Sequence, residues 1–285
     1  MSDRYLITGS GGQLGKALAE AYPEATTLSK SQLDIADDEQ LEAIDWSNYD
    51  VVINAAAYVN ADHSETVEGQ AITWRANAEG PAKLSKIAIQ YGLHLIHFSS
   101  EYVFDGTKSN HNEDESFSPL NVYGQTKAAA DTIVGEVPKH HILRTTWVVG
   151  EGHNFVRTMN NLANLRIDPA VVNDQFGRLT FTSELVRAVG HILEKDIDSG
   201  TYNLSNSGQI RSFAEIAALT FELGGHDPER VKPISTEEYK EGKANFAPRP
   251  AHSDLDLSKI RKTGFISVDY EDLLPEYVAA LPGIN

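Results

Sequence analysis

The order of hydrophobic and polar positions predicts strands and helices that alternate through the first half of the chain. Short apolar runs typical of buried strands lie at residues 4–8, 25–29, 50–57, 93–100 and 140–149. Segments with helical periodicity lie between them, at residues 16–21, 38–44, 64–91 and 123–136. Within the long segment 64–91 we expect a break near Gly69 and a bend at Pro81. Such alternation is typical of a doubly wound parallel sheet, so we predict an α/β fold.

The alternation becomes irregular after Gly150. Predicted helices there span residues 154–165, 183–193 and 212–223, and two more begin at Ser258 and Asp269. Short strands are predicted at residues 170–173, 201–204 and 231–235, and a turn at residues 174–178. We therefore expect a large sheet domain over residues 1–149, which the chain rejoins at about 180–200, and a smaller mixed α/β domain that occupies mainly residues 150–285.

Composition and charge exclude several classes of protein. With 41% hydrophobic and 23% charged residues, the 285-residue chain can form a sizeable core and is not a disordered segment. It contains no cysteine, which excludes disulfides, thiolate metal sites and a cysteine nucleophile. A formal net charge of −17 argues against a nucleic-acid partner, because such binding needs clustered Lys and Arg.

Neither a signal peptide nor a membrane span is expected. The first nine residues lack the apolar segment of a signal peptide and lead directly into the first predicted strand. No apolar run approaches the roughly 18 residues that a transmembrane helix needs. We therefore expect a cytoplasmic protein without a membrane partner.

A glycine-rich turn joins the first predicted strand to the first helix. Gly9, Gly12 and Gly15 follow a G-x-x-G-x-x-G pattern, while Leu14 stands where the stricter G-x-G-x-x-G has its last glycine. Glycines allow the backbone to approach a pyrophosphate, and the helix N-terminus supplies N–H donors and a positive dipole end. The context favours a dinucleotide-binding turn over an ordinary glycine turn.

The second strand predicts the choice of dinucleotide. An acid about 20 residues past the glycines often binds the ribose 2′-hydroxyl, and counting alone selects Asp34. The strand, however, ends near Ser29, which places Ser29 and Lys30 at the ribose and Asp34 with Ile35 at the adenine. A ribose corner without an acid favours a 2′-phosphate and hence NADPH, with NADH also possible. The alternative is that Lys30 is a plain surface lysine.

Tyr123 and Lys127 are the candidate catalytic pair. They lie four residues apart in a predicted helix and so share one face. An ammonium beside a phenol favours the phenolate and lowers the pKa of the phenol toward working pH. A chain with eleven tyrosines can carry one such pair by chance, so the pair needs a surrounding site.

The strand at 93–100 supplies that site. Ser100 and Glu101 leave its carboxyl end, where the side chains of an active site emerge from a parallel sheet. His94 and His97, spaced by three within the strand, face opposite sides and are interpreted as structural rather than as metal ligands.

Several stretches, in order and nearly end to end, resemble one family. The glycine turn with Gln13, Leu14 and Gly15, the small strand end Ala55–Tyr58 and the Tyr123/Lys127 pair are similar to the extended short-chain dehydrogenase/reductases. Within that group the chain resembles the dTDP-4-dehydrorhamnose reductases in residues 12–15, 102–106, 119–124, 144–147, 173–177 and 249–253. The resemblance implies a Rossmann domain, a smaller substrate-binding domain, and an NADPH- or NADH-dependent oxidoreductase.

The implied reaction is the last step of dTDP-L-rhamnose biosynthesis, in which hydride reduces the C4 ketone of dTDP-4-dehydro-L-rhamnose. In that reaction Tyr123 protonates the forming alkoxide. Lys127 lowers the pKa of Tyr123 and binds the nicotinamide ribose. The remaining implied cofactor contacts are Gly9, Gly11, Gly12, Gln13, Leu14, Ala56, Ala57 and Tyr58, besides those at the ribose and adenine. The implied substrate contacts are Ser100, Glu101, Tyr102, Trp147 and Arg249, with the Ser100 hydroxyl also tuning the tyrosine.

The chain departs from the family pattern at Ser100-Glu101, where Thr-Asp is usual, so the contact of Glu101 to the sugar can shift. Trp147 could instead be a core residue, and Arg249 could bind the diphosphate or only close its loop. Some relatives form dimers through magnesium, but no acids here map to such a site. We expect no metal, and a monomer or homodimer.

Two rival functions remain open. One is a nucleotide-sugar epimerase or dehydratase of the same superfamily, in which Glu101 would be an acid–base group. The other is a catalytically silent subunit that binds NADP and regulates another enzyme.

Overall fold

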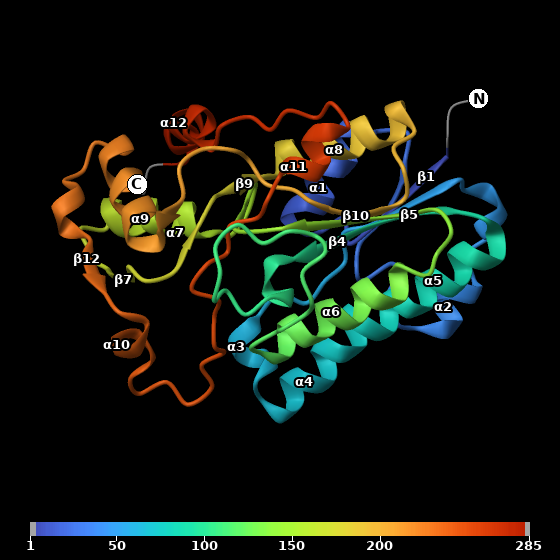
Figure 1. Cartoon of the computed structure of the whole chain (residues 1–285), viewed down its shortest axis with the longest axis horizontal. Coiled ribbons are helices and arrows are strands. Elements are labelled where there is room, and N and C mark those ends of the chain that lie inside the picture. Colours follow the sequence, from blue (N-terminus) through green and yellow to red (C-terminus); the bar gives the residue numbers. More distant parts are fainter. Residues whose placement is uncertain (1–3, 283–285) are drawn as a thin grey trace.

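A six-stranded parallel sheet forms the centre of the computed structural model, which describes residues 4–282 (Figure 1). Its strand order is β10-β5-β4-β3-β1-β2, and every neighbouring pair is parallel. The strands are β1 (Tyr5–Thr8), β2 (Thr26–Leu28), β3 (Val51–Asn54), β4 (His94–Ser100), β5 (His140–Thr145) and β10 (Gly200–Asn203). The doubly wound α/β fold predicted from the alternation of strands and helices is confirmed.

Helices cover both faces of this sheet. Helices α1 and α8 pack together over one face, and α5 packs beside α6 over the other (Figure 1). The helices around the sheet are α1 (Gln13–Ala21), α2 (Asp38–Glu42), α3 (Ala61–Ser64), α4 (Val67–Trp74), α5 (Gly80–Tyr91), α6 (Val122–Val134), α8 (Thr182–Lys195) and α11 (Ser258–Lys262). Short 3-10 turns η1 (Trp46–Asn48) and η3 (Glu101–Val103) follow α2 and β4.

Both faces of each strand are apolar, because successive residues of a strand point into two different core layers. In β1, Ile7 packs toward α1 and α8, whereas Leu6 packs toward α5 and α6. The same division separates Ile96 from Leu95 in β4 and recurs in β3 and β5. Period-two alternation under helices on both faces explains why the strands are continuous hydrophobic runs.

The helix predicted over 64–91 is interrupted as expected, but at residues 65–66 rather than at Gly69. The chain forms α3, then α4, a π-helical turn η2 (Arg75–Glu79) and α5. Thr66 caps α4 by accepting the Gly69 N–H, so the interruption precedes Gly69, which lies within α4. Pro81 lies directly after the π-helical turn, at the start of α5, so the helix is irregular close to the bend expected at this proline.

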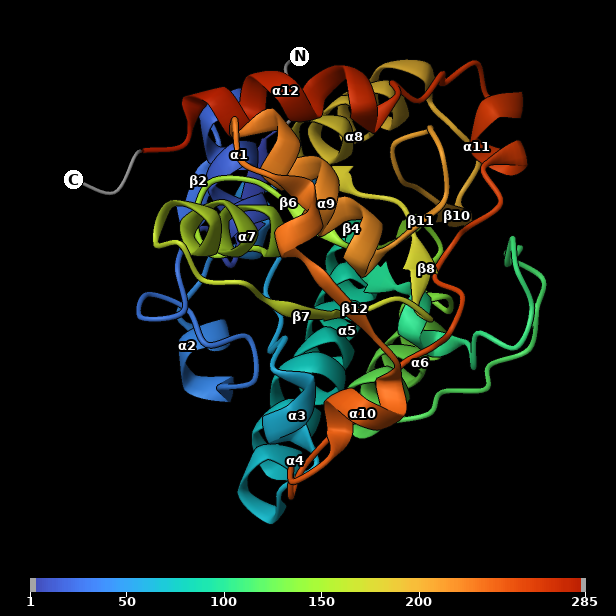
Figure 2. The ribbon, with the colours of Figure 1, turned by 90° about the vertical axis from the view of Figure 1, so that its left-hand side faces the viewer.

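The rest of the chain lies beyond the carboxyl ends of the strands (Figures 1 and 2). It contains three two-stranded sheets, β11 with β8, β12 with β7, and β6 with β9. The strands are β6 (Val148–Val149), β7 (Ala170–Val172), β8 (Phe176–Gly177), β9 (Thr180–Phe181), β11 (Arg211–Ser212) and β12 (Lys232–Ile234). The helices are α7 (Phe155–Asn164), α9 (Phe213–Leu223), η4 (Pro228–Arg230), α10 (Thr236–Lys240) and α12 (Tyr270–Ala280).

Two details of this part differ from the prediction. The single strand expected over 140–149 is interrupted between β5 and β6, because Trp147 adopts a positive φ of 40° that a strand cannot accommodate. The turn expected over 174–178 contains β8, which pairs with β11.

Helix α8 and strand β10 return to the large sheet, where β10 forms an edge beside β5. The division into two domains stays a prediction. Between residues 4 and 282, no helix has the length and apolar content to cross a membrane.

Candidate active site

The candidate site lies at the carboxyl edge of the sheet, where β1, β3, β4 and β5 end. Parallel strands deliver their last side chains to one edge, and here the chain beyond β5 packs over that edge (Figure 2). Two cavities open along it, one beside the glycine turn and one among α7, β7 and α10.

The glycine turn is shaped by close approach of two backbones. Gly9 has a φ of 71°, and a Cβ there would lie 2.5 Å from the backbone nitrogen of Ala56. Gly12 is the N-cap of α1 and provides no side-chain cap for the first helical N–H groups. Unoccupied donors at a helix start, with no side chain above them, fit an anionic pyrophosphate.

A cavity of about 220 Å³ adjoins this turn and brings together most of the predicted cofactor residues. It is lined by Gly9, Gly11, Gly12, Lys30, Leu33, Asp34, Ile35, Ala55, Ala56, Ala57, Tyr58 and Ala76. Residues from the ends of β1, β2 and β3 thus meet in one cavity, as a dinucleotide crossing the strand ends requires.

Charged side chains of both signs meet at the predicted ribose corner. Asp34 lies in the same cavity as Lys30, and its carboxylate accepts from Arg75. Although burial acts to raise it, the pKa of Asp34 is lowered through this bond and through Lys30. Asp34 therefore pairs with Arg75 in the cavity that Lys30 also lines, and the placement of Ser29 and Lys30 at the ribose and of Asp34 at the adenine stays a prediction. Ser29 bonds Gln32 at the rim of the turn.

Two residues predicted to bind cofactor use their side chains elsewhere. Leu14 packs against the core beneath α1. The Gln13 side-chain oxygen accepts from the Gly150 N–H at 3.1 Å and from Asn154 at 3.3 Å, which ties α1 to the segment after β6. Cofactor binding by these two residues stays a prediction and would depend on their backbone N–H groups.

Tyr123 lies beside Ser100 and Glu101, as the sequence predicted. The Ser100 hydroxyl donates to Glu101 Oε2 at 2.6 Å, and its proximity acts to lower the pKa of the Tyr123 phenol. Tyr102 packs edge-on against Tyr123, with the ring centroids 5.6 Å apart. The candidate proton donor is therefore one hydroxyl away from a carboxyl group.

Glu101 is almost completely buried, with 3% of its surface exposed, among hydroxyl groups. Thr146 donates to its Oε1 at 3.0 Å, and Ser253 also hydrogen-bonds the carboxylate. Burial raises the pKa of Glu101 to about 7, while these hydroxyl groups act to lower it. A carboxyl group with this pKa exchanges a proton near neutral pH.

The predicted effect of Lys127 on the pKa of Tyr123 stays a prediction, because the hydrogen bonds of the lysine lead elsewhere. The Lys127 side chain donates to the Phe98 carbonyl at 2.6 Å and lies 3.2 Å from His97 Nε2. Burial lowers the pKa of Lys127 to about 8. The pKa of Tyr123 is raised instead, because the phenol is desolvated and faces the Glu101 carboxylate. Sequence spacing placed both residues on one face of α6 but could not supply the partners of the amine.

A polar chain beneath the site explains the position of Lys127. Asn54 Oδ1 accepts from Thr8 and from the Ala56 N–H, which orients the Asn54 amide nitrogen toward His97 Nδ1. His97 then carries its proton on Nε2 and directs it at the Lys127 nitrogen, an arrangement that favours the neutral amine. His94 lies on the opposite face of β4, so the expectation that the two histidines face opposite sides is confirmed.

A second cavity of about 380 Å³ lies beyond the tyrosine. Its lining residues are His153, Asn154, Phe155, Thr158, Met159, Ala170, Val171, Val172, Gln175, Phe213, Tyr239 and Arg249. Trp147 stacks on Phe213 with 3.8 Å between ring centroids, so it belongs to the wall behind this cavity. Apolar rings beside a single arginine suit a ligand with a flat ring and a negative charge.

Arg249 connects this cavity to Tyr102. Its guanidinium pairs with Asp62 at 2.8 Å, hydrogen-bonds the Tyr102 phenol and lies 4.5 Å over the Phe246 ring. The Asp62 carboxylate also accepts the Ala247 N–H, which fixes the loop. Arg249 therefore closes the loop and also lines the cavity, while binding of the diphosphate by Arg249 stays a prediction.

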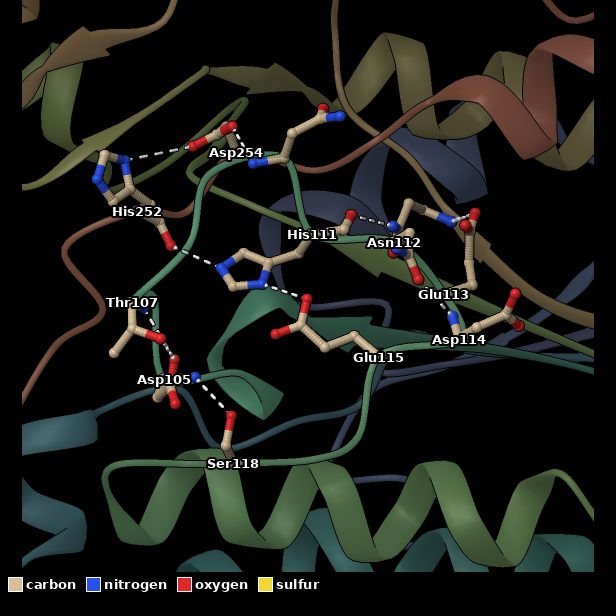
Figure 3. Close-up of polar contacts among 12 residues, drawn as sticks. Asp105, Thr107, His111, Asn112, Glu113, Asp114, Glu115, Ser118, His252 and Asp254 are labelled. Atoms are coloured by element: carbon tan, nitrogen blue, oxygen red, sulfur yellow. Dashed lines mark hydrogen bonds and ion pairs between the residues drawn. The ribbon is translucent and has the colours of Figure 1, made fainter.

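The loop over 105–118 is fastened to the segment that contains Ser253 (Figure 3). His111 bonds Glu115 at 2.9 Å and the His252 carbonyl at 3.3 Å, and it stacks on Phe104. Asp254, fully buried, accepts from the Asn110 N–H. These contacts hold residues 252–254 in place and thereby fix the Ser253 hydroxyl at Glu101.

Sequence reasoning missed most of the residues that surround the carboxyl group and the second cavity. Thr146, directly after β5, and Ser253, in a loop far along the chain, lie in the stretches 144–147 and 249–253 that carry the resemblance, but the sequence assigned neither residue a role at Glu101. Phe155, Phe213 and Tyr239 line the second cavity, but in the sequence they look like ordinary core residues. Within residues 4–282, no three His, Asp or Glu side chains are grouped so as to hold a metal ion.

Comparison with known proteins extends over nearly the whole chain. Residues 3–282 match the model of the family described as RmlD substrate binding domain. The dTDP-4-dehydrorhamnose reductase of Mycolicibacterium smegmatis is 35% identical over 99% of this chain and 87% of its own. A dTDP-4-keto-6-deoxy-D-glucose reductase of Streptomyces niveus is 31% identical over 94% and 93%.

A crystal structure is also similar. The dTDP-4-dehydrorhamnose reductase of Bacillus anthracis, in complex with NADP, aligns with a TM-score of 0.89 and 30% identity over 98% of this chain and 99% of its own. The cavity at the glycine turn and the tyrosine beside it thus belong to a fold that binds NADP in a relative.

Proposed function

The chain belongs to the RmlD substrate binding domain family, and on this premise we propose that it is an NADPH-dependent reductase of a dTDP-linked 4-keto-6-deoxy sugar. The proposed reaction converts dTDP-4-dehydro-L-rhamnose to dTDP-L-rhamnose, the last step of dTDP-rhamnose biosynthesis. Relatives with 35% and 30% identity carry the name of this reductase, and one of them binds NADP.

The observation that carries the proposal is the position of the Tyr123 phenol beside Ser100 and against the Tyr102 ring, where strand β4 ends at the carboxyl edge of the sheet. Reduction of a ketone needs a hydride on carbon and a proton on oxygen. NADPH, when bound, supplies the hydride. Tyr123 protonates the oxygen at C4, and Ser100 orients the carbonyl and the phenol toward each other. The cavity near Arg249 would hold the nucleotide, with the diphosphate against the guanidinium.

A second substrate has specific support. The relative from Streptomyces niveus is named as a reductase of dTDP-4-keto-6-deoxy-D-glucose, which differs from dTDP-4-dehydro-L-rhamnose in configuration on the sugar. Retention of the Tyr123 proton donor weighs against a silent regulatory subunit, and the presence of one buried carboxyl group beside it weighs against a dehydratase, which uses further acid–base carboxylates.

The direct test mixes the purified protein with NADPH and each of the two keto sugars, and follows the absorbance of the reduced cofactor. We expect oxidation of NADPH with dTDP-4-dehydro-L-rhamnose, and formation of dTDP-L-rhamnose by chromatography. If NADPH were oxidised only with dTDP-4-keto-6-deoxy-D-glucose, that sugar would be the substrate instead. Binding of NADPH without oxidation in either mixture would contradict the reductase and favour the silent subunit.

Lys30 tests the choice of cofactor. It lies in the ribose corner of the 220 Å³ cavity and would face a 2′-phosphate. Lys30→Ala should raise the KM for NADPH by about tenfold and leave the KM for NADH almost unchanged, because only the first carries the phosphate. Lys16→Ala, on the outer face of α1, is the matched control for loss of a surface cation. An equal effect of Lys30→Ala on both cofactors would contradict this assignment.

A further inference from the structure

We propose that Asn121 is a positioning residue whose side-chain amide fixes the distance between Arg249 and Tyr123. The inference rests on the proposed function, in which Arg249 binds the diphosphate and Tyr123 protonates the oxygen at C4. A nucleotide sugar held at Arg249 then presents its ketone to the phenol only if its own span from diphosphate to C4 matches that distance. Asn121 therefore determines which nucleotide-linked keto sugars are reduced, without touching them.

The Asn121 amide bonds two segments that are far apart in the sequence. Its Oδ1 accepts the Gly124 N–H at 2.8 Å, so Asn121 is the N-cap of helix α6, which carries Tyr123 in its first turn. Its Nδ2 donates to the Pro248 carbonyl at 2.7 Å, directly before Arg249. Asn121 is only 2% exposed, so water has little access to either bond. One planar group thus joins the start of the helix to the arginine loop.

Helix α3 and the residue after it join the same two segments from a third side. Asp62 pairs with Arg249 at 2.8 Å and accepts the Ala247 N–H at 2.9 Å, which attaches α3 to the loop. Glu65 accepts the Val122 N–H at 2.9 Å, which attaches it to the first turn of α6. The loop, α6 and the α3 segment are therefore joined pairwise by polar contacts. The loop and α6 cannot shift relative to each other without breaking at least one of these contacts.

Arg249 can still bind an anion within this arrangement. Its Nη1 donates to the Ala247 carbonyl at 2.6 Å and its Nη2 pairs with Asp62, whereas a guanidinium has five N–H donors. Its side chain is 20% exposed and lines the cavity of about 380 Å³. The contacts with the loop and with α3 therefore orient the guanidinium and leave donors for a diphosphate.

The start of α6 is fixed more firmly than the loop. A Cβ added to Gly124 would lie 2.2 Å from the Tyr102 carbonyl oxygen, so the first turn of α6 packs directly on the backbone of η3. The Tyr102 ring in turn packs edge-on against Tyr123. Loss of the Asn121 donor should therefore displace the loop that carries Arg249 and leave Tyr123 in place.

Asn121→Ser separates the helix cap from the link to the loop. Serine caps a helix about as well as asparagine, but its short side chain cannot also reach the Pro248 carbonyl. With NADPH and dTDP-4-dehydro-L-rhamnose, kcat should fall by about tenfold, because the ketone is no longer held in line with the phenol. The Kd for NADPH and the Ki for dTDP, which has the diphosphate but no ketone, should stay within about twofold of wild type.

Asn121→Asp is the second variant. It also keeps the cap, but it places a carboxylate oxygen against the Pro248 carbonyl, so repulsion should displace the loop further. We expect kcat to fall by about 10²-fold, again with little change in the Kd for NADPH.

Asn206 provides the matched control. Its Oδ1 accepts the Phe181 N–H at 2.8 Å at the start of α8, and its Nδ2 donates to the Val268 carbonyl at 3.0 Å. Asn206 is fully buried, and α8 covers the other face of the sheet (Figure 1). Asn206→Ser removes the same kind of link, so it should lower the free energy of unfolding to a similar extent and leave kcat unchanged.

Arg249→Gln shows whether Asn121 acts through the loop. In this variant the diphosphate loses its cation, so there is no longer an anchored ketone for Asn121 to position. Adding Asn121→Ser should then lower kcat/KM by no more than about twofold. An effect confined to α6 would instead lower kcat/KM by about tenfold with either residue at position 249.

Three results would overturn the proposal. They are wild-type kcat in Asn121→Ser, a loss of dTDP affinity in that variant as large as its loss of kcat, and equal losses from Asn121→Ser with and without Arg249→Gln. Failure of the proposed function would look different, since the wild type itself would then oxidise no NADPH with the keto sugar.

Discussion

Titratable groups are buried at both the carboxyl edge and the amino edge of the central sheet, but only those at the carboxyl edge belong to the candidate active site. At the carboxyl edge, Tyr123 lies beside Ser100, whose hydroxyl donates to the buried Glu101 carboxyl group. At the amino edge, His94 Nε2 lies 2.7 Å from His141 Nδ1, and this pair adjoins a polar cavity of about 270 Å³. Burial shifts the pKa values at both edges.

The difference is in the partners. The two histidines share one hydrogen bond, while His141 Nε2 is buried without a hydrogen-bond partner. Burial lowers the pKa of His94 to about 3 and that of His141 to about 4. Nearby Lys139 and His140 act in the same direction. Glu101 has hydroxyl partners that can donate or accept, so it can hold either protonation state. A shifted pKa alone therefore does not identify a site, whereas a shifted pKa in a network of reversible donors does.

The largest expected effect comes from tyrosine-to-phenylalanine changes at the two edges. Tyr123→Phe should lower kcat by about 10³-fold, because it removes the proton donor, and should leave NADPH affinity almost unchanged. Tyr202→Phe is the matched change away from the cleft, since its phenol only donates to the Asp198 carbonyl. For both variants, steady-state rates measure kcat and fluorescence titration measures the affinity for NADPH. Comparable losses in the two variants would remove the distinction between the edges.

Two glycines with the same backbone conformation give the next contrast. Gly9 and Gly92 have φ values of 71° and 68°, but a Cβ would collide with Ala56 at Gly9 and would meet nothing within 4 Å at Gly92. Gly92→Ala should cost only the strain of a left-handed residue, about 1 kcal/mol of stability. Gly9→Ala should cost more and weaken NADPH binding by at least about tenfold, because the turn must move away from β3.

Chemical denaturation and NADPH titration separate the two outcomes. If Gly9→Ala retained wild-type affinity for NADPH, the close approach of the glycine turn to β3 would not be what shapes the cofactor cavity.

The smallest effect concerns stability rather than activity. The pKa values of His94 and His141 are depressed in the folded protein, so the unfolded chain binds more protons as pH falls below about 6.5. Their contribution to stability is complete above that pH and is lost as pH falls toward about 4. The loss amounts to at most roughly 1.4 kcal/mol per histidine and pH unit.

The double variant His94→Phe/His141→Phe should flatten this part of the pH dependence, measured as the free energy of unfolding between pH 7 and pH 5. Its turnover at pH 7 should equal that of the wild type, because the pair lies away from the cleft. A parallel pH dependence in wild type and variant would show that the histidines do not titrate on unfolding.

The sequence by itself determined the features that depend on short-range order. Period-two apolar runs and helical segments predicted the parallel sheet, because each element carries its own pattern of burial. The glycine turn, the strand ends at Ala56 and Ser100, and the shared helix face of Tyr123 and Lys127 follow from spacings of a few residues. The sequence could not predict the π-helical turn at Arg75–Glu79 or the positive φ of Trp147, since both depend on how neighbouring segments pack.

Only the tertiary structure decided the chemistry of these residues. Glu101 obtains its pKa from burial and from Thr146, 45 residues away, and from Ser253, which a distant loop delivers. Lys127 was expected to activate Tyr123 but is held by Phe98 and His97, because the polar chain from Thr8 and Asn54 ends at its nitrogen. Desolvation and hydrogen-bond direction depend on groups from separate strands that come into contact at one point. The spacing of residues along the chain does not predict such long-range contacts.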